Sequence, residues 1–292
     1  MVSLLLYMSV EDRSEGYKSL VDEIITRDHS PLYRDLLTSS GPHELLNQLH
    51  LVRGRYATAE RMTVRRYFET PGLRTPNRDL FWARMGEAKE LQAREAIRKT
   101  EVYFNGLGVE YGYGPLMAEA QKVVEELGHA QGFFTLVSTF SYGRTRPNSL
   151  NLSDYPIQVA FGQVRRDLWQ NWDFDLGKAV AEDFEGGGGA HILALTEVRE
   201  GPFTDVIARV ARSIYRQEIA HMNRGGGALK RFAPDLTADQ WAHIFEMNHR
   251  SGSLRVPARG EQFSYPWSVE EARNLIADAR EGRLEPFIPV KI

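Results

Sequence analysis

Three Glu-x-x-His motifs are the residues of this 292-residue chain whose types and spacing are suited to chemistry. Residues three apart share one face of an α-helix, so each motif can aim a carboxylate and an imidazole at the same point. Carboxylates and imidazoles are ligands for transition metals such as iron and manganese. The motifs are Glu126/His129, Glu218/His221 and Glu246/His249.

A bundle-type metal centre needs a further carboxylate on the helix that precedes each motif. In an antiparallel helix pair, the two ligands must lie at similar distances from the connecting turn. Glu126 lies 16 residues beyond a turn centred near residue 110, and Glu95 is the carboxylate nearest to that distance before it. Glu218 lies 16 residues beyond a second turn, centred near Pro202, and Glu185 is the carboxylate nearest to that distance before it. One rule therefore predicts two similar half-sites.

The third motif does not satisfy this rule. At the matching distance before its turn stands Met222, and no carboxylate lies within three residues of it. His249 is also expected in the last turn of a short helix, where an imidazole can meet free carbonyl groups. The sequence therefore predicts metal at the first two motifs only. Competing carboxylates remain on the preceding helices: Glu90, Glu101, Glu182 and Asp183.

Helical periodicity fills most of the chain and strand alternation is scarce, so the sequence predicts an all-α fold. Both predicted half-sites fall on segments with this helical pattern. The expected helices cover residues 17–25, 43–65, 77–103, 115–140, 156–186 with a resumption over 190–200, 203–224 and 237–250, with a last helix that starts at Ser268.

Glycine and capping residues predict where these helices begin and end. Gly186–Gly189 predicts an irregularity beside the metal site, with a π-bulge that opens a pocket. Gly225–Gly227 predicts a helix stop. Thr237 is expected to cap one helix, and Ser268-Val-Glu-Glu has the capping-box pattern. Residues 141–154 are polar and predict a loop.

The composition excludes several classes of protein. There is no cysteine, which rules out disulfides, zinc ribbons, iron–sulfur ligation and thiol catalysis. The net charge of −3 gives no support for a nucleic-acid or anionic-membrane partner. No stretch approaches the roughly 18–20 apolar residues of a membrane span. The apolar start of the chain is too short for a signal-peptide core, so a cytoplasmic location is expected.

Around the first two motifs the sequence resembles a known enzyme family. AEAQKVVEELGHAQGFF looks like the second metal helix of the phenylacetyl-CoA epoxidase catalytic subunit, and ARSIYRQEIAHMNRGG is similar to its fourth. Glu185-Gly-Gly resembles the carboxylate of its third helix, although that ligand is often Asp. The benzoyl-CoA epoxidase oxygenase component is a related match. Bacterial multicomponent monooxygenases fit less well, because Gly128 and Ala220 replace the Arg before each metal His.

The resemblance covers about residues 85–230 and implies a ferritin-like four-helix bundle there. It implies an N-terminal helical extension at residues 1–75, the bundle at 76–230 and a C-terminal extension at 231–292. It further implies a di-iron monooxygenase that uses O2, with Fe/Fe or Mn/Fe as the metal pair. Electrons would come from a separate reductase, and a homo-oligomer or a partner subunit without ligands is expected. One ion would be held by Glu95, Glu126 and His129, and the other by Glu185, Glu218 and His221.

Apolar side chains that continue the two motif faces predict the kind of substrate. Such walls favour a flat apolar ring over a sugar or an amino acid. The resemblance implies epoxidation of an aromatic acyl-CoA, whose charged head would lie near Arg224, Lys230 and Arg231. The predicted pocket residues are Phe133, Phe134, Val137, Ile214 and Met222, and Phe140 continues the first face.

Other functions use the same ligands. An oxygenase acting on a free small molecule, by hydroxylation, N-oxygenation or oxidative rearrangement, keeps the site and changes the reaction. Ferritin-like iron storage is a second alternative, but storage proteins are usually compact four-helix chains and this chain has large flanking segments. A metal-free scaffold is disfavoured by two intact half-sites. Simple surface salt bridges are disfavoured because a carboxylate on an apolar face is unfavourable unless paired or metal-bound.

Overall fold

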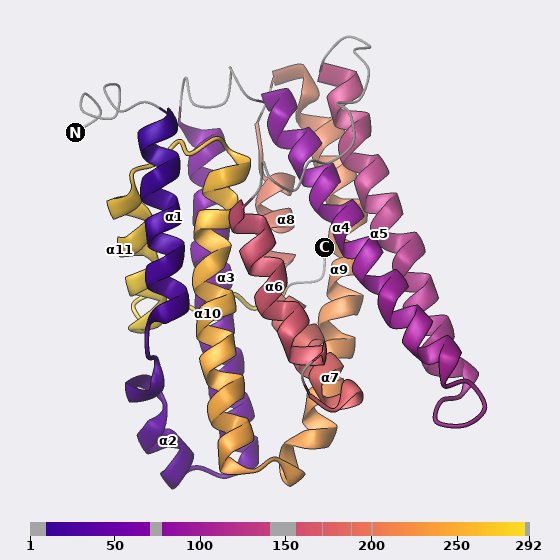
Figure 1. The fold of residues 1–292 in the computed structure, drawn as a ribbon. Coiled ribbons are helices and arrows are strands. Elements are labelled where there is room, and N and C mark those ends of the chain that lie inside the picture. Colours follow the sequence, from indigo (N-terminus) through magenta and orange to yellow (C-terminus); the bar gives the residue numbers. More distant parts are fainter. Residues whose placement is uncertain are drawn as a thin grey trace. The chain divides into compact units, whose positions relative to one another are not determined.

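A computed structural model of the chain describes residues 10–70, 78–140, 156–170, 172–187, 189–199 and 201–289. Within these ranges every element is a helix, apart from one isolated bridge between Leu107 and Tyr111 (Figure 1). The all-α prediction is confirmed. No helix among the described residues is both long enough and apolar enough to cross a membrane. The loop expected at residues 141–154 lies outside the described residues.

The chain divides into two compact units. The larger unit joins Met1–Arg74 to Leu152–Ile292, and the smaller unit is Thr75–Asn151. This division differs from the three consecutive segments with boundaries at residues 75 and 230. The physical reason is that both ends of the chain share one hydrophobic core with the middle helices, so they are not extensions of a separate bundle.

Thirteen helical elements are described in the larger unit. Its core contains buried side chains from helices far apart in the sequence, among them Tyr17, Leu49, Val180, Leu254 and Ile276. The elements are α1 (Val10–Thr26), η1 (Ser30–Leu32), α2 (Arg34–Ser39), α3 (Pro42–Glu69), α6 (Pro156–Gln170), α7 (Phe174–Phe184), η3 (Glu185–Gly187), α8 (Gly189–Thr196), η4 (Gly201–Phe203), α9 (Thr204–Phe232), η5 (Ala233–Asp235), α10 (Ala238–Gln262) and α11 (Val269–Arg280).

Helix α10 is longer than its glycines indicate. The predicted end near Arg250 is wrong, because α10 continues to Gln262 through Gly252 and Gly260. A Cβ at Gly252 would lie 2.3 Å from the Tyr56 ring of α3, and one at Gly260 would lie 2.5 Å from the Tyr17 ring of α1. These glycines therefore permit close helix packing and do not end the helix.

The other glycine runs behave in opposite ways. Helix α9 continues through Gly225–Gly227 to Phe232, so the predicted helix stop is wrong. The break at Gly186–Gly189 is confirmed, but it is the 3₁₀ turn η3 and not a π-bulge. The expected helix over 156–186 is also divided, because α6 ends at Gln170 and Asp173 caps the start of α7. The capping boxes at Thr237 and Ser268 are confirmed.

The smaller unit is a hairpin of two long helices, α4 (Arg78–Asn105) and α5 (Tyr113–Phe140) (Figure 1). Aromatic packing sets their register. The Phe133 ring stacks on Trp82 with centroids 6.2 Å apart, and Phe134 fills the space over Gly86, where an added Cβ would lie 2.7 Å from its ring. These contacts determine which α4 residue faces each α5 residue.

Candidate metal centre

Helix α5 presents the first motif inside the helix hairpin. Glu126 and His129 are both almost fully buried, and His129 Nδ1 lies 3.1 Å from Glu126 Oε2. The same carboxylate oxygen lies 3.1 Å from Lys89 Nζ, a buried ammonium of α4. The three-residue spacing puts carboxylate and imidazole on one face of α5, as the sequence predicts. They form the α5 half-site.

The charge state of Glu126 follows from these neighbours. Burial raises the pKa of its carboxyl group, but the Lys89 ammonium, the hydrogen bond from His129 and the Lys122 charge lower it more. The pKa of Glu126 falls to about 2 as a result. The carboxylate is therefore ionised at every physiological pH, which is the state in which it can bind a metal.

Helix α9 presents the second motif. Its buried positions recur three or four residues apart, at Ile207, Ala211, Ile214, Glu218 and His221, so the motif lies on the apolar face of the helix. The Nδ1 atom of His221 lies 3.9 Å from Oε2 of Glu218. This pair is the α9 half-site, and it buries a carboxylate and an imidazole on one face.

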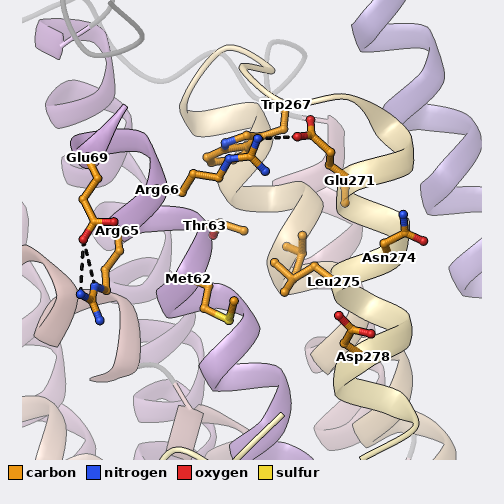
Figure 2. A pocket seen from close by; sticks show the side chains of 12 residues that line it. Met62, Thr63, Arg65, Arg66, Glu69, Trp267, Glu271, Asn274, Leu275 and Asp278 are labelled. Atoms are coloured by element: carbon orange, nitrogen blue, oxygen red, sulfur yellow. Dashed lines mark hydrogen bonds and ion pairs between the residues drawn. The ribbon is translucent and has the colours of Figure 1, made fainter. Parts of the chain in front are cut away.

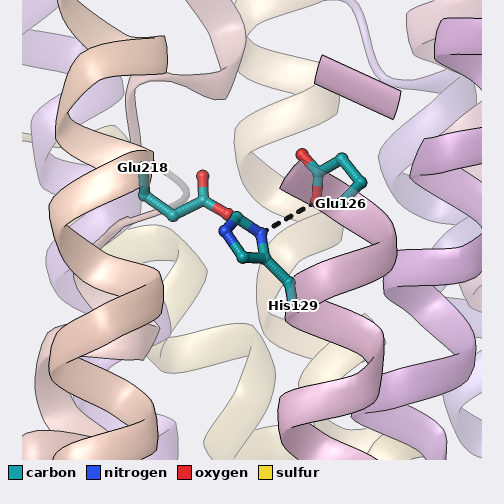
Figure 3. Close-up of side chains that lie close together, drawn as sticks. All are labelled: Glu126, His129 and Glu218. Atoms are coloured by element: carbon teal, nitrogen blue, oxygen red, sulfur yellow. Dashed lines mark hydrogen bonds and ion pairs between the residues drawn. The ribbon is translucent and has the colours of Figure 1, made fainter. Parts of the chain in front are cut away.

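Glu126, His129 and Glu218 form a buried group that could hold a metal ion (Figure 3). Each residue offers one ligand atom, and the three atoms lie within 4.8 Å of one another. Within the described ranges, no other three His, Asp or Glu side chains meet this condition.

The two carboxylates predicted on the preceding helices lie outside this group. Glu95 Oε2 is 3.8 Å from Arg98 Nη1, at the edge of the buried stripe of α4. Glu185 is paired with Arg165 of α6. Counting from the turn selects Glu95, whereas the packing register places Lys89 opposite Glu126.

The competing carboxylates of α7 are held by other partners. Glu182 pairs with Lys178 at 2.6 Å. Asp183 is fully buried, and its Oδ1 lies 2.8 Å from Arg53 Nη1 and 2.9 Å from His50 Nε2. Burial raises the pKa of Asp183, but this guanidinium and this imidazole lower it below its usual value.

The third motif belongs to a hydrogen-bonded network of the larger unit. Glu246 accepts hydrogen bonds from the His29 backbone N–H and the Tyr33 hydroxyl, and it contacts His29 Nδ1 at 2.9 Å. His249 Nδ1 lies 3.0 Å from the Tyr56 hydroxyl, and its ring stacks on that of His29. His249 lies in the middle of α10, so its expected position in a last turn is wrong. These polar contacts account for the motif without a metal.

The predicted pocket residues are buried or half-buried, and several serve the packing of their own unit. Phe133 and Phe134 pack on α4, and Met222 lies against Gly189, where an added Cβ would be 2.9 Å from its Cε. Val137 and Ile214 are buried. The side chains of Phe140 and Arg224 lie outside the described residues, whereas Lys230 and Arg231 are exposed in the last turn of α9.

A separate pocket of about 500 Å³ lies between α3 and α11 (Figure 2). Its apolar lining includes Met62, Trp267 and Leu275. Its charged residues are paired with each other or with neighbours, such as Arg66 with Glu271 and Arg65 with Glu69. None of its lining residues is a predicted metal ligand, so this pocket is distinct from the candidate metal centre.

Sequence reasoning did not identify one buried lysine and one buried ion cluster. Lys89 could have been found, because it falls on the same stripe as Trp82 and Met85, where a lysine must meet a buried partner. The second group is a buried ion cluster, Glu60 with Arg255 and Arg259. Its members lie on α3 and α10, and no local spacing links residues so far apart in the chain.

Comparisons with known proteins give no relative: no family model, no curated protein and no solved structure matches this chain. The resemblance to the epoxidase family therefore stays a prediction from the residue pattern. The function has to be inferred from the residues of the candidate centre themselves.

Proposed function

We propose that this chain is an iron-dependent oxygenase whose metal centre includes Glu126, His129 and Glu218. The observation that supports it is that three buried ligand atoms of these residues lie within 4.8 Å of one another. Carboxylate and imidazole donors without thiolates suit iron and manganese. Iron held by such donors keeps open coordination positions and supplies the electron-transfer chemistry that O2 activation requires.

The protein groups around the centre have distinct roles in this proposal. Glu126 is ionised because its pKa is low, so it is ready to bind a cation without losing a proton. The hydrogen bond between His129 and Glu126 orients both ligands. His221, beside Glu218, is the natural fourth ligand. Burial of all four side chains excludes water, which strengthens their electrostatic interactions and limits side reactions.

The resemblance adds finer expectations to this proposal. A ferritin-like dinuclear centre would need Glu95 and Glu185 as further ligands. Glu95 would then have to break its ion pair with Arg98, and Glu185 its ion pair with Arg165. An aromatic acyl-CoA is the first substrate class to test, with a separate reductase as electron donor. The exposed residues Lys230 and Arg231 at the end of α9 would then meet the charged CoA head.

Matched motif variants test the proposal. Glu218→Gln should lose iron and the reductant-dependent uptake of O2 in the presence of an aromatic acyl-CoA. Glu246→Gln removes the same group from the third motif and should keep both. The measurements are metal content after anaerobic loading with Fe(II), followed by O2 consumption. A wild-type protein that binds no iron, or a Glu246→Gln variant that loses iron equally, would refute the proposal.

A further inference from the structure

A small pocket of about 150 Å³ lies between helices α1, α10 and α11 of the larger unit. These three helices pack against one another, so the pocket is formed within one compact unit (Figure 1). It is smaller than the sites of drug-sized molecules, which measure roughly 300–1,000 Å³, and larger than the roughly 30 Å³ that one water molecule takes up in the liquid. It therefore suits a ligand of a few heavy atoms.

Guanidinium groups dominate the charged wall of this pocket. Arg27 follows the end of α1, and Arg273 and Arg280 lie seven residues apart on α11, which places them two turns apart on one helix face. Their side chains are between 18% and 42% exposed, so an ion from solution can reach them. Among the described lining residues, Glu23 is the only carboxylate. Three guanidinium groups against one carboxylate favour an anion as the ligand.

The acidic partners of Arg27 and Arg273 leave hydrogen-bond donors available. Glu23 accepts from Arg27 Nη2 at 2.9 Å through Oε1 and from Arg273 Nε at 3.2 Å through Oε2, so both of its oxygens are occupied. Arg273 also donates from Nη1 to Glu270, which does not line the pocket. A guanidinium group has five N–H donors, so both arginines keep donors for a ligand.

Arg280 has a weaker hold on its own carboxylate partner. Its Nη2 donates to Glu281 Oε1 at 3.0 Å, and the other oxygen of Glu281 accepts from Arg283. Arg283 in turn bonds Asp278, and none of these three partners lines the pocket. The charge of Glu281 is therefore shared between two arginines, of which only Arg280 belongs to the wall.

His29 completes the polar wall without adding charge. It is almost fully buried, and its Nδ1 lies 2.9 Å from Glu246 Oε1. Burial lowers the pKa of His29, and the charges of Arg250 and Arg27 act in the same direction, against the effect of Glu246. The ring is therefore neutral at neutral pH. Glu246 is not a lining residue, and its charge is balanced by Arg250 at 2.9 Å.

We propose that this pocket binds a small free oxyanion, with inorganic phosphate as the first candidate, held by Arg27, Arg273 and Arg280. Planar guanidinium groups match the oxygen atoms of such an anion, and hydrogen bonds between two charged groups are the strong ones. The pocket volume holds the anion itself and not the remainder of a nucleotide. The inference goes beyond the proposed function and does not depend on it, because no predicted metal ligand lines this pocket.

Calorimetric titration of the full-length protein with inorganic phosphate tests the proposal. A chelator removes bound metal first, so that phosphate cannot bind at a metal centre, and potassium chloride keeps the ionic strength constant. One phosphate per chain is expected. The same titration with adenosine monophosphate should show weaker binding. Absence of phosphate binding would overturn the site, and tighter binding of adenosine monophosphate would overturn the assignment to a free anion.

Matched arginine variants locate the bound anion. Arg280→Gln should weaken phosphate binding about tenfold or more, as expected for the loss of a charge-assisted hydrogen bond. Arg283→Gln is the control, because Arg283 bonds the same Glu281 but does not line the pocket, and it should keep the wild-type Kd. Circular dichroism checks that both proteins fold. If Arg280→Gln does not fold, Arg273→Gln replaces it, since this side chain is 42% exposed. Equal weakening in the pocket variant and the control would refute the site.

Discussion

The two compact units each bury a carboxylate under positive charge, but they do so with different cations. In the smaller unit the lysine cluster, defined as Lys89, Glu126 and His129, surrounds its carboxylate with one ammonium and one imidazole. In the larger unit the arginine cluster, defined as Glu60, Arg255 and Arg259, surrounds its carboxylate with two guanidinium groups.

In the arginine cluster both carboxylate oxygens are occupied by guanidinium groups. Arg255 Nη1 lies 3.1 Å from Oε2 of Glu60, and Arg259 Nε lies 2.8 Å from Oε1, so both carboxylate oxygens are bonded. Arg255 also donates to the carbonyl of Phe184 at the end of α7. The cluster thus ties α3 and α10 to the helix break before η3. Because arginine stays charged and binds in a planar fork, this arrangement is architectural.

The lysine cluster has the features of a site that accepts a ligand. Lysine is a single point charge on a flexible stem, whereas a guanidinium group binds a carboxylate in a planar fork. An imidazole beside the carboxylate adds a second metal-binding atom. The comparison teaches that burial of a carboxylate does not by itself mark a site. Glu60 also has an imidazole nearby, since His191 Nδ1 lies 3.4 Å from its Oε1. What distinguishes the two clusters is therefore the cationic partner, one ammonium against two guanidinium groups.

The largest expected effect comes from opening the arginine cluster. Glu60→Ala would leave two buried guanidinium groups without their carboxylate, and removal of one partner of a buried ion pair typically costs about 3–5 kcal/mol in the free energy of unfolding. Chemical denaturation of the purified variant measures this. The control is Glu69→Ala, whose exposed pair with Arg65 should contribute less than about 1 kcal/mol. Equal losses of unfolding free energy in the two variants would contradict a structural role for the cluster.

The second effect separates the clusters by metal. A ligand that binds only the folded state at 100 times its Kd stabilises that state by about 2.7 kcal/mol. Co(II) should therefore raise the Tm of the wild-type protein and leave the Tm of Glu126→Gln unchanged. Glu60→Gln should start from a lower Tm and keep the full Co(II)-dependent increase. An increase that disappears in Glu60→Gln and persists in Glu126→Gln would reverse the assignment of the two clusters.

The extent of sequence-based prediction differs between these regions for physical reasons. The helical period was sufficient to predict that Glu126 shares a face with His129, and Glu218 with His221, because such positions follow from helix geometry alone. The pairing of Lys89 with Glu126 could not be predicted by counting from a turn. That register depends on how aromatic rings pack between the two helices.

Glycines show the same limit within the larger unit. A glycine ends a helix when the chain needs a left-handed residue, but it continues a helix when a neighbour packs closely. Gly252 is of the second kind because Tyr56 lies against it, and Tyr56 belongs to a helix nearly 200 residues earlier in the chain. The sequence of α10 alone does not contain this contact. The capping boxes at Thr237 and Ser268 were predictable because all their bonds are local.

The third expected effect concerns the pH dependence of stability at the third motif, Glu246 with His249. The His29 ring stacks on that of His249. Burial lowers the pKa of His249 from 6.5 to about 3, and the charges of His29 and Arg280 act in the same direction. His249 therefore takes up a proton near pH 6.5 in the unfolded chain, whereas in the folded chain it stays neutral down to about pH 3. Stability is full above pH 6.5 and is lost as the pH falls towards 3, by about 2 kcal/mol between pH 6.5 and 5.

Urea denaturation at a series of pH values checks this prediction. His249→Asn removes the titrating ring, so its stability should depend less on pH over the same range. A wild-type protein that is equally stable at pH 6.5 and 5 would show that His249 is not held neutral by burial.

The last pair of variants, which includes the smallest expected change, tests the helix that carries both arginines of the arginine cluster. An added methyl group at Gly252 would approach Tyr56 Cδ2 to 2.3 Å, so Gly252→Ala should destabilise the fold by about 1–3 kcal/mol through overpacking. Gly227 of α9 has no heavy atom within 4 Å of an added Cβ, so Gly227→Ala should stabilise by about 0.5–1 kcal/mol through helix propensity. Differential scanning calorimetry gives both signs. Opposite signs would show that α10 depends on close contact with α3, whereas α9 tolerates its glycines without needing them; two changes of the same sign would contradict this difference.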